Sequence, residues 1–319
     1  MIGIGLVGCG PWGLNYIRNF AQQKGAKVIR VWDTNKEAME AALREDSRLR
    51  TAGSMAELLD EPSIQGIIIA TPPDSHYALA KGCLEKEKHV LVEKPFTLSL
   101  NHARELEGMA RAKGLVVLAG HLMEYHPAVL KVKRYIASGL LGELWYLDCR
   151  RMGRGKIRGD VNVLWDLAVH DIALACFLVD SLPLEVAAHG KSYLQGGLPE
   201  VVFLALRFAN GVMVHIQASW LVMNRNRCMT VVGEEKTVFL DELNQEQPLV
   251  VYEADGRAVH PQVDGSQPLA NMCAHFVACI NGKAKPLSGP EDAVRVLAVL
   301  EAAQGSLNAK GTPVQVMGG

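Results

Sequence analysis

Three side chains of this sequence have the types and spacing needed to move a proton to or from an alcohol. Asp166 and His170 stand at positions i and i+4, so on a helix they share one face. An imidazole has a pKa near neutrality and suits removal of a hydroxyl proton, while the Lys94 ammonium can stabilise a developing alkoxide. Taken singly, a solvated lysine and a structural histidine are the alternative interpretation.

A glycine pattern near the N-terminus predicts a dinucleotide site. Residues 8–13 read Gly-Cys-Gly-Pro-Trp-Gly, which matches G-x-G-x-x-G, and an aspartate follows about 20 residues later. The first glycine permits a tight turn, the second lets the backbone approach a pyrophosphate, and the third lets a helix pack closely on a strand. The cofactor-binding residues predicted here are Gly8, Gly10, Pro11, Trp12, Gly13 and Asp33. A glycine-rich turn that binds nothing is the alternative.

Asp33 indicates which nicotinamide cofactor the site favours. Its carboxylate can accept hydrogen bonds from both ribose hydroxyls and would repel a 2′-phosphate. The next two residues, Thr34 and Asn35, supply no arginine to hold such a phosphate. We therefore expect NAD rather than NADP.

Two further segments end where ligands bind in a parallel sheet. One apolar run ends at Thr71-Pro72-Pro73, and another extends from His89 to Glu93, just before Lys94. Ligands bind at the carboxyl ends of parallel strands, so both segments are expected at the cofactor site, with a rigid loop as the alternative for the first. The residues added to the cofactor-binding set are Thr71, Pro72, His76, Glu93 and Lys94.

The first 120 residues alternate short apolar runs with helical patterns. Strands are expected at residues 2–8, 26–32, 66–70, 89–93 and 115–119. Helices are expected at residues 12–24, 36–45, 75–87 and 100–113. This order predicts right-handed crossovers and a doubly wound parallel sheet, an α/β Rossmann domain over residues 1–120.

After residue 120 the pattern changes to helices followed by strands. Helices are expected at residues 128–138, 165–179 and 291–307. Strands are expected at residues 184–189, 201–208, 212–220, 227–232 and 237–240. Asn210-Gly211 is a hairpin turn signal between two of these strands. We expect residues 121–319 to form an α+β domain with a large, mostly antiparallel, open-faced sheet that binds the substrate and mediates oligomerisation.

Bulk properties exclude several classes of protein. The net charge of the 319 residues is −1, so no global field attracts nucleic acid or an anionic membrane. No apolar run approaches the roughly 18 residues of a membrane span. The seven cysteines are scattered without a C-x-x-C pair, and the first residues indicate a strand rather than a signal peptide. We expect a cytoplasmic protein with no metal and a small-molecule partner.

Together these motifs resemble the Gfo/Idh/MocA family of sugar oxidoreductases. The glycine fingerprint, Glu93-Lys94-Pro95 and the Asp-x-x-x-His pair at 166 and 170 stand in the family's order and spacing, over essentially the whole chain. The resemblance implies that Lys94, Asp166 and His170 are the catalytic residues, with His170 as general base. It also implies hydride transfer between a secondary alcohol carbon and nicotinamide, and a homodimer or homotetramer formed through the open sheet face.

Two stretches, residues 120–129 and 162–172, look like the nucleotide-sugar 3-dehydrogenases of surface-polysaccharide pathways, of the UDP-N-acetylglucosamine type. Between them lies a basic segment that is expected to form a loop. This loop either binds a diphosphate or is simply a solvated basic surface. Its cations are Arg150, Arg151, Arg154, Lys156 and Arg158. The predicted substrate-binding residues are Lys94, His121, Tyr125, His126, Arg154, Arg158, Trp165, Asp166 and His170.

Two other functions fit the same motifs. A dehydrogenase of a free polyol or simple sugar, of the inositol or aldose type, would use the same catalytic residues. A non-catalytic NAD-binding regulatory protein would not need them, so the presence of Lys94, Asp166 and His170 argues against it. The basic segment favours a nucleotide sugar over a free polyol.

Overall fold

The computed structural model describes residues 1–155, 157–194 and 196–317, which divide into two compact units. The first unit comprises residues 1–125 and 267–297, and the second comprises residues 126–266 and the chain from residue 298 onward. The chain therefore leaves the first unit at Tyr125 and later returns to it. The sequence predicted a single connection between two domains near residue 120. The return of the chain could not be predicted, because periodicity shows that a helix has an apolar face but not which sheet that face covers.

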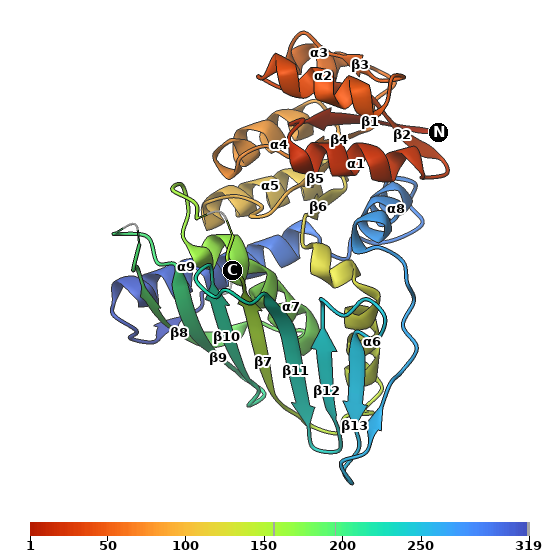
Figure 1. The fold of residues 1–319 in the computed structure, drawn as a ribbon. Helices are drawn as coiled ribbons and strands as arrows, with labels where there is room; N and C mark the ends of the chain where they lie inside the picture. The colour runs from red at the N-terminus through yellow and green to blue at the C-terminus, as the bar shows by residue number, and fades with distance from the viewer. Residues whose placement is uncertain (156, 195, 318–319) are drawn as a thin grey trace. The chain divides into compact units, whose positions relative to one another are not determined.

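The first unit contains a parallel sheet with the strand order β3-β2-β1-β4-β5-β6 (Figure 1). Its strands are β1 (Ile2–Val7), β2 (Ala26–Trp32), β3 (Arg50–Thr51), β4 (Gly66–Ile69), β5 (His89–Val92) and β6 (Val117–Ala119). The strand order reverses between β1 and β4, and ligands bind at such a switch point. The predicted Rossmann fold is confirmed.

Helices connect these strands in the expected alternation. They are α1 (Pro11–Ala21), α2 (Lys36–Glu45), α3 (Met55–Asp60), α4 (His76–Glu85) and α5 (Leu100–Lys113), with short 3-10 turns at Pro73–Ser75 and Leu122–Tyr125. Neither β3 nor α3 was predicted from the sequence, because both are short. A signal for α3 exists: Ser54 caps it by accepting a hydrogen bond of 3.1 Å from the Glu57 N–H, and the Glu57 carboxylate accepts one from Gly53.

The returning segment supplies α8 (Pro268–Ile280), which the sequence analysis did not predict. Its apolar side chains, including Met272 and Phe276, join the core built by Ile4 and Leu6 of β1. A Cβ placed on Gly66 would lie 3.1 Å from Phe276 Cε1, so α8 packs against the start of β4. The helix α9 (Pro290–Asn308) then begins in the first unit and ends in the second.

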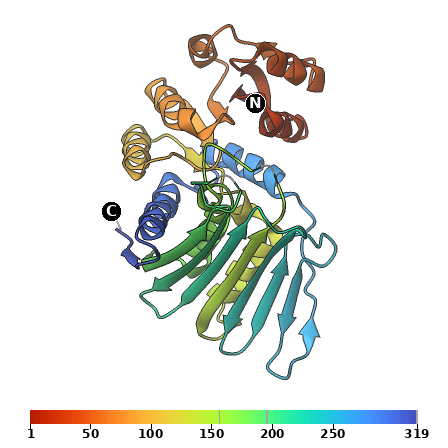
Figure 2. The same cartoon turned by 60° about the vertical axis from the view of Figure 1, so that its left-hand side comes forward.

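Within the described residues, the second unit contains a nine-stranded sheet in the order β14-β13-β12-β11-β7-β10-β9-β8-β15 (Figure 2). Its strands are β7 (Leu144–Met152), β8 (Pro183–Lys191), β9 (Val201–Phe208), β10 (Met213–Ser219), β11 (Asn226–Gly233), β12 (Thr237–Asp241), β13 (Leu249–Tyr252), β14 (Ala258–Val259) and β15 (Val314–Gln315). Among the described residues, neighbouring strands of this sheet run antiparallel, except β7 with β10, which are parallel. The predicted antiparallel sheet is confirmed.

The strand β7 corrects the prediction of a loop over residues 150–158. Arg150 and Arg151 lie in this central strand, and only the residues after Met152 form a loop. The inward positions of β7 are Leu147, Cys149 and Arg151, all buried. An arginine at an inward position hid the alternating pattern from which a strand is inferred.

Two helices, α6 (Pro127–Ala137) and α7 (Val169–Val179), pack on one face of this sheet. The other face carries exposed apolar side chains, among them Tyr146, Phe203 and Met213. Among the described residues, no helix is both long and apolar enough to cross a membrane.

Candidate active site

Two of the three fingerprint glycines have a steric reason within the protein, and the third leaves open space. Gly8 has φ +93°, and a Cβ there would lie 2.6 Å from the Ala70 carbonyl oxygen. A Cβ on Gly13 would overlap the Gly8 carbonyl oxygen, so α1 packs tightly on the end of β1. A Cβ on Gly10 would meet no atom within 4 Å. Packing therefore requires glycine at 8 and 13, whereas Gly10 leaves open space at the N-terminus of α1, where N–H groups suit a phosphate.

Pro11 and Trp12 form the first turn of α1. Proline has no backbone N–H, and at the first position of a helix an N–H would find no partner within the helix. Pro11 therefore loses no hydrogen bond there, and its fixed φ suits a helix start. The Trp12 side chain is 43% exposed. Both residues thus lie beside the open space at Gly10.

The carboxylate of Asp33 is held at the end of β2 by two backbone donors. The Cys9 N–H donates to Oδ2 at 2.6 Å, and the Asn35 N–H donates to Oδ1 at 2.8 Å. Asp33 lines a cavity of about 370 Å³. Other lining residues include Gly8, Gly10, Thr71, Pro72 and Asp74. The charged residues lining this cavity, within the described part of the chain, are the two carboxylates Asp33 and Asp74, and an additional phosphate would be repelled there.

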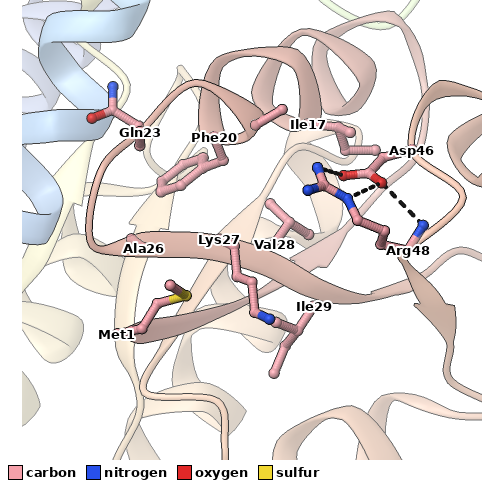
Figure 3. Close-up of a pocket in the computed structure, with 11 residues that line it drawn as sticks. Met1, Ile17, Phe20, Gln23, Ala26, Lys27, Val28, Ile29, Asp46 and Arg48 are labelled. Carbon is pink, nitrogen blue, oxygen red and sulfur yellow. Dashed lines mark hydrogen bonds and ion pairs between the residues drawn. The ribbon is translucent and has the colours of Figure 1, made fainter.

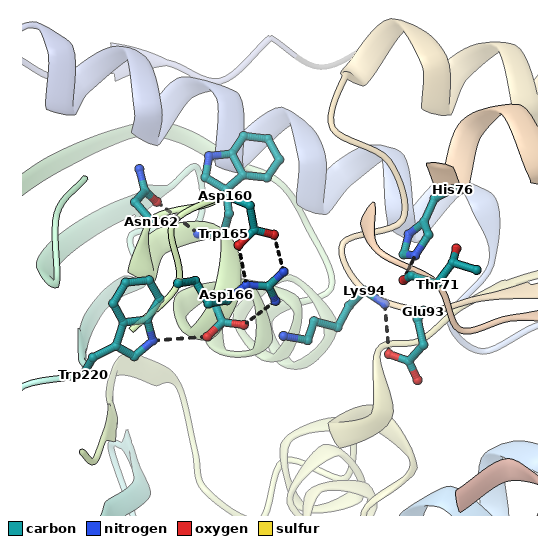
Figure 4. Close-up of polar contacts among 10 residues, drawn as sticks. Thr71, His76, Glu93, Lys94, Asp160, Asn162, Trp165, Asp166 and Trp220 are labelled. Atoms are coloured by element: carbon teal, nitrogen blue, oxygen red, sulfur yellow. Dashed lines mark hydrogen bonds and ion pairs between the residues drawn. The ribbon is translucent and has the colours of Figure 1, made fainter. Parts of the chain in front are cut away.

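His76, which the sequence predicted to bind the cofactor, is not among the described residues that line this cavity. Its side chain is fully buried, with one ring nitrogen 2.8 Å from the Thr71 carbonyl (Figure 4). The other ring nitrogen lies 2.8 Å from the Pro95 carbonyl. Burial lowers the pKa of His76, and a neutral ring donates only one N–H. His76 therefore donates a hydrogen bond to one of these two carbonyls at a time, and its ring packs between the loop after β4 and the loop after β5. Sequence alone could not show on which side of the first turn of α4 the ring lies.

Glu93 is also buried and held by protein groups. The Tyr16 hydroxyl of α1 donates to Glu93 Oε1 at 2.8 Å, and the Lys94 N–H donates to Oε2 at 3.1 Å. Burial raises the pKa of the Glu93 carboxyl. This carboxyl ties the fingerprint helix to the backbone that carries Lys94, whose side chain is half-buried.

Two residues that were predicted to bind substrate lie inside the first unit. His121 is 4% exposed, and its Nδ1 lies 3.3 Å from Oε1 of the buried Glu124. Tyr125 is 2% exposed, and its hydroxyl shares a hydrogen bond of 2.9 Å with the Ser288 hydroxyl. Both side chains are thus buried within the first unit, and Ser288 occupies the hydroxyl of Tyr125. Their contact with substrate stays a prediction. His126 caps α6 by accepting a hydrogen bond from the Ala128 N–H.

In the second unit, the stretch predicted as one helix from Trp165 starts with a π-helical turn, Leu164–Ala168, followed by α7. Asn162 caps the turn by accepting hydrogen bonds from the N–H groups of Leu164 and Trp165. The side chains of Asn162 and Trp165 both donate to Gln304 Oε1, at 2.9 and 3.2 Å. Single π turns are common at functional sites, and this one carries Asp166.

Asp166 lies among polar partners in the second unit. The Trp220 indole donates to Asp166 Oδ2 at 3.1 Å, which Figure 4 shows. Arg158 Nη1 lies 3.4 Å from Asp166 Oδ1, while Arg158 Nε and Nη2 form two shorter hydrogen bonds to Asp160. Two carboxylates thus already compensate the charge of Arg158. His170, the second residue of α7, is half-buried.

A cavity of about 250 Å³ adjoins Asp166 in the second unit. Arg154, a predicted substrate-binding residue, lines it together with Arg225 and Arg227, which were not predicted from the sequence. The signal for these two was the run Asn-Arg-Asn-Arg at residues 224–227, just before a predicted strand. Lys156, also part of the predicted basic segment, lies outside the described residues.

Asp171, the residue after His170, is held by a buried arginine. Arg151 donates two hydrogen bonds to the Asp171 carboxylate, at 2.9 and 3.0 Å, and two more to Glu242. All three side chains are at most 8% exposed. Arg151 is therefore a structural cation between β7 and α7, not part of a surface loop.

A further hollow of about 200 Å³ lies in the first unit, at the amino ends of β1 and β2 (Figure 3). Its charged lining consists of Lys27, Asp46 and Arg48, and Arg48 is paired with Asp46 at 2.8 Å. Ligands of parallel sheets bind at carboxyl ends, so this hollow has no place in the site. Among the described residues, no group of His, Cys, Asp or Glu side chains is placed to hold a metal ion.

Comparisons with known proteins agree with this geometry. A model of the oxidoreductase family with an NAD-binding Rossmann fold matches residues 2–121, and a model of the GFO/IDH/MocA C-terminal domain matches residues 129–239. UDP-N-acetylglucosamine 3-dehydrogenase of Acidithiobacillus ferrooxidans is 30% identical over 239 residues, 74% of each chain. Its solved structure, GnnA, has a TM-score of 0.88 at 27% identity and covers 97% of this chain and 98% of that chain.

Another relative has a different substrate in its name. The scyllo-inositol 2-dehydrogenase (NAD(+)) of Bacillus subtilis is 25% identical over 327 residues, 98% of this chain and 95% of that protein. Both relatives are dehydrogenases, and the two family models cover both halves of the chain. The protein is therefore a member of the Gfo/Idh/MocA family of oxidoreductases, with an NAD-binding Rossmann unit.

Proposed function

We propose that the protein is an NAD-dependent dehydrogenase that oxidises a nucleotide-activated sugar, a UDP-N-acetylhexosamine or its uronic acid, at carbon 3. The observation that carries this proposal is the arginine-lined cavity that adjoins Asp166. A free polyol carries no charge that would require several guanidinium groups beside a catalytic carboxylate. The relative that shares 30% identity, a UDP-N-acetylglucosamine 3-dehydrogenase, supports the same substrate class.

The residues of the first unit fit NAD. Open space at Gly10 and the N–H groups of α1 suit its pyrophosphate, and the fixed carboxylate of Asp33 suits the ribose hydroxyls. Asp33 and Asp74 in the cavity lining disfavour the extra phosphate of NADP. When bound, the nicotinamide supplies the carbon that accepts or returns a hydride.

Lys94, Asp166 and His170 then handle the proton of the reacting hydroxyl. We assign His170 as the base that removes this proton, and Lys94 as the cation that stabilises the oxygen while charge develops on it. Asp166 lies four residues before His170, and Trp220 holds one of its oxygens in place. Trp165 can contribute only its ring face, because its N–H is bonded to Gln304.

Fluorescence titration with NADH and NADPH, followed by NAD reduction assays, tests this proposal. NADH should bind more tightly than NADPH, and Asp33→Ala should reduce the ratio between the two dissociation constants.

UDP-, dTDP- and GDP-sugars should be compared with free polyols as substrates, and a UDP-sugar should be turned over best. Lys94→Ala and His170→Ala should each lower turnover by about 10²–10⁴-fold while NADH still binds. Good turnover of polyols with no turnover of any nucleotide sugar would establish the polyol dehydrogenase instead.

The open face of the nine-stranded sheet is our proposed surface for a homodimer or homotetramer. Tyr146, Phe203 and Met213 expose 46%, 41% and 55% of their surface there, and clustered apolar side chains favour self-association. Sedimentation should show a dimer or tetramer, and Met213→Glu should dissociate it. A wild-type monomer would contradict the proposed oligomer.

We also propose a cytoplasmic location, since all seven cysteines are free thiols.

A further inference from the structure

The cavity beside Asp166 holds more positive than negative charge. Four arginines line it: Arg151, Arg154, Arg225 and Arg227. The carboxylates in or directly behind it are Asp166, Asp171 and Glu242, the last two bonded to Arg151. Arg158 and Asp160 add one charge of each sign and leave the balance unchanged. A cavity with this surplus of positive charge favours an anionic ligand.

Two of the arginines face each other across neighbouring strands. In the register of β7 with β11, Arg151 is paired directly with Arg227. Like charges at opposed positions of an antiparallel pair destabilise a sheet. Burial, together with the charges of Arg151 and Arg225, lowers the pKa of Arg227. The repulsion between these guanidinium groups is offset when an anion occupies the cavity.

Within the described part of the chain, neither Arg225 nor Arg227 forms a hydrogen bond or salt bridge with a carboxylate, whereas Arg151 and Arg158 do. Glu242 and Asp171 attract the Arg227 guanidinium only at longer range. Arg154 donates to the thioether of Met223 at 3.2 Å, a weak acceptor that carries no charge. These three arginines therefore have donors available for a ligand.

The backbone positions Arg225 on the cavity wall. A Cβ placed on Gly153 would lie 3.2 Å from Arg225 Cγ, so the aliphatic stem of Arg225 packs closely on the chain just after β7. The Gly153 N–H donates to the Ser219 carbonyl at 3.1 Å, which fixes this part of the loop to the end of β10. Since β7, β10 and β11 hold Arg225 and Arg227 in place, the arrangement is more defined than a solvated basic loop.

Building on the proposed function, we propose that Arg225 and Arg227, assisted by Arg154, bind the phosphate groups of the substrate. The ligand of this cavity is then a sugar that carries a diphosphate or phosphate ester. Guanidinium groups bind phosphate oxygens with paired, charge-assisted hydrogen bonds. Arg158, which the sequence predicted for this role, is instead held by Asp160 and Asp166.

Calorimetric titration of the full-length protein without cofactor tests the proposal directly. The ligands are UDP, inorganic pyrophosphate, uridine and glucuronate. UDP and pyrophosphate should bind, while uridine, which lacks the phosphates, should not. The double variant Arg225→Gln/Arg227→Gln should weaken UDP binding by about tenfold or more, because each charged hydrogen bond contributes substantially. An unchanged UDP affinity in the double variant, or binding of glucuronate but not of UDP, would overturn the proposal.

Two further variants guard against loss of the fold. Arg225 is exposed, so Arg225→Gln alone should fold and still weaken UDP binding. Arg257→Gln removes an exposed arginine near β14, where its partner is Asp255, and should leave UDP binding unchanged. Equal losses in Arg225→Gln and Arg257→Gln would show that only general charge matters, which also overturns the proposal.

Turnover separates this inference from the proposed function. If the wild-type protein oxidises a UDP-sugar and the double variant keeps the same KM, the arginines do not bind the phosphates and only this inference fails. If the wild-type protein binds UDP through Arg225 and Arg227 but oxidises only free polyols, the phosphate site stands and the proposed substrate fails.

Discussion

The Trp220 indole N–H donates a hydrogen bond of 3.1 Å to Asp166 Oδ2 and so connects the end of β10 to the π-helical turn. Trp220 is only 2% exposed, so water does not readily replace this donor. Trp220→Phe removes the donor and keeps most of the packing. Since a hydrogen bond to a charged group contributes roughly 1.5–3 kcal/mol, kcat should fall by about tenfold or more, measured as NAD reduction.

The matched control is Trp165→Phe. It removes a comparable indole bond, that of 3.2 Å to Gln304, without changing a partner of Asp166. This variant should lose some stability and keep a kcat closer to that of the wild type. Equal falls in kcat for both variants would mean that Trp220 acts only through packing.

His76→Gln should weaken NADH binding. The variant loses the buried ring that packs between the carbonyls of Thr71 and Pro95, so the Thr71 loop at the cofactor cavity is held less firmly. We expect Kd for NADH to rise by about fivefold, in line with roughly 1 kcal/mol per hydrogen bond. His89→Gln is the control. It removes the hydrogen bond that the His89 ring, at the start of β5, accepts from the Val116 N–H, and it should leave Kd for NADH unchanged. A similar rise in both variants would contradict the role of His76.

The same histidine should make stability depend on pH. Burial lowers the pKa of His76 below its ordinary value of 6.5, so below about pH 6.5 the unfolded chain binds a proton that the folded chain does not. The free energy of unfolding should therefore decrease as the pH falls through this value toward the lower pKa of the folded state. Urea titrations at about pH 7.5 and 5.5 should show a smaller decrease in His76→Gln than in the wild type. Equal decreases would show that other groups cause it.

Arg151→Met should destabilise the second unit strongly. It leaves Asp171 and Glu242 buried without their shared cation, and loss of one partner in a buried ion pair typically costs about 3–5 kcal/mol. Urea denaturation should show the loss. Arg207→Met breaks an ion pair with Glu185 that is solvent-exposed, and should shift the midpoint little. If the two variants were equally stable, the buried network would not support the fold.

The Rossmann unit could be predicted from local patterns because each of its signals is local. The separate roles of Gly8, Gly10 and Gly13 follow from spacing within one loop, and the structure gives Gly8 and Gly13 a steric reason and leaves open space at Gly10. The antiparallel sheet could be predicted from alternation and from Asn210-Gly211, which sits between β9 and β10 as a turn.

Features that depend on which segments meet could not be predicted in this way. Arg227 is far in sequence from Arg151, and only the register of β7 with β11 places them opposite each other. Tyr125 follows a motif that suggested substrate contact, yet Ser288 arrives from the returning segment and occupies its hydroxyl. The π turn at Asp166 likewise changes the helix locally without a pattern of its own.

The return of α8 to the first unit has a consequence for synthesis and for engineering. A nascent chain that has emerged only as far as Tyr125 lacks Met272 and Phe276, so the apolar surface that they cover is still exposed to water. Residues 1–125 expressed alone should aggregate, and a chimera that exchanges the cofactor-binding module must exchange residues 267–297 along with them.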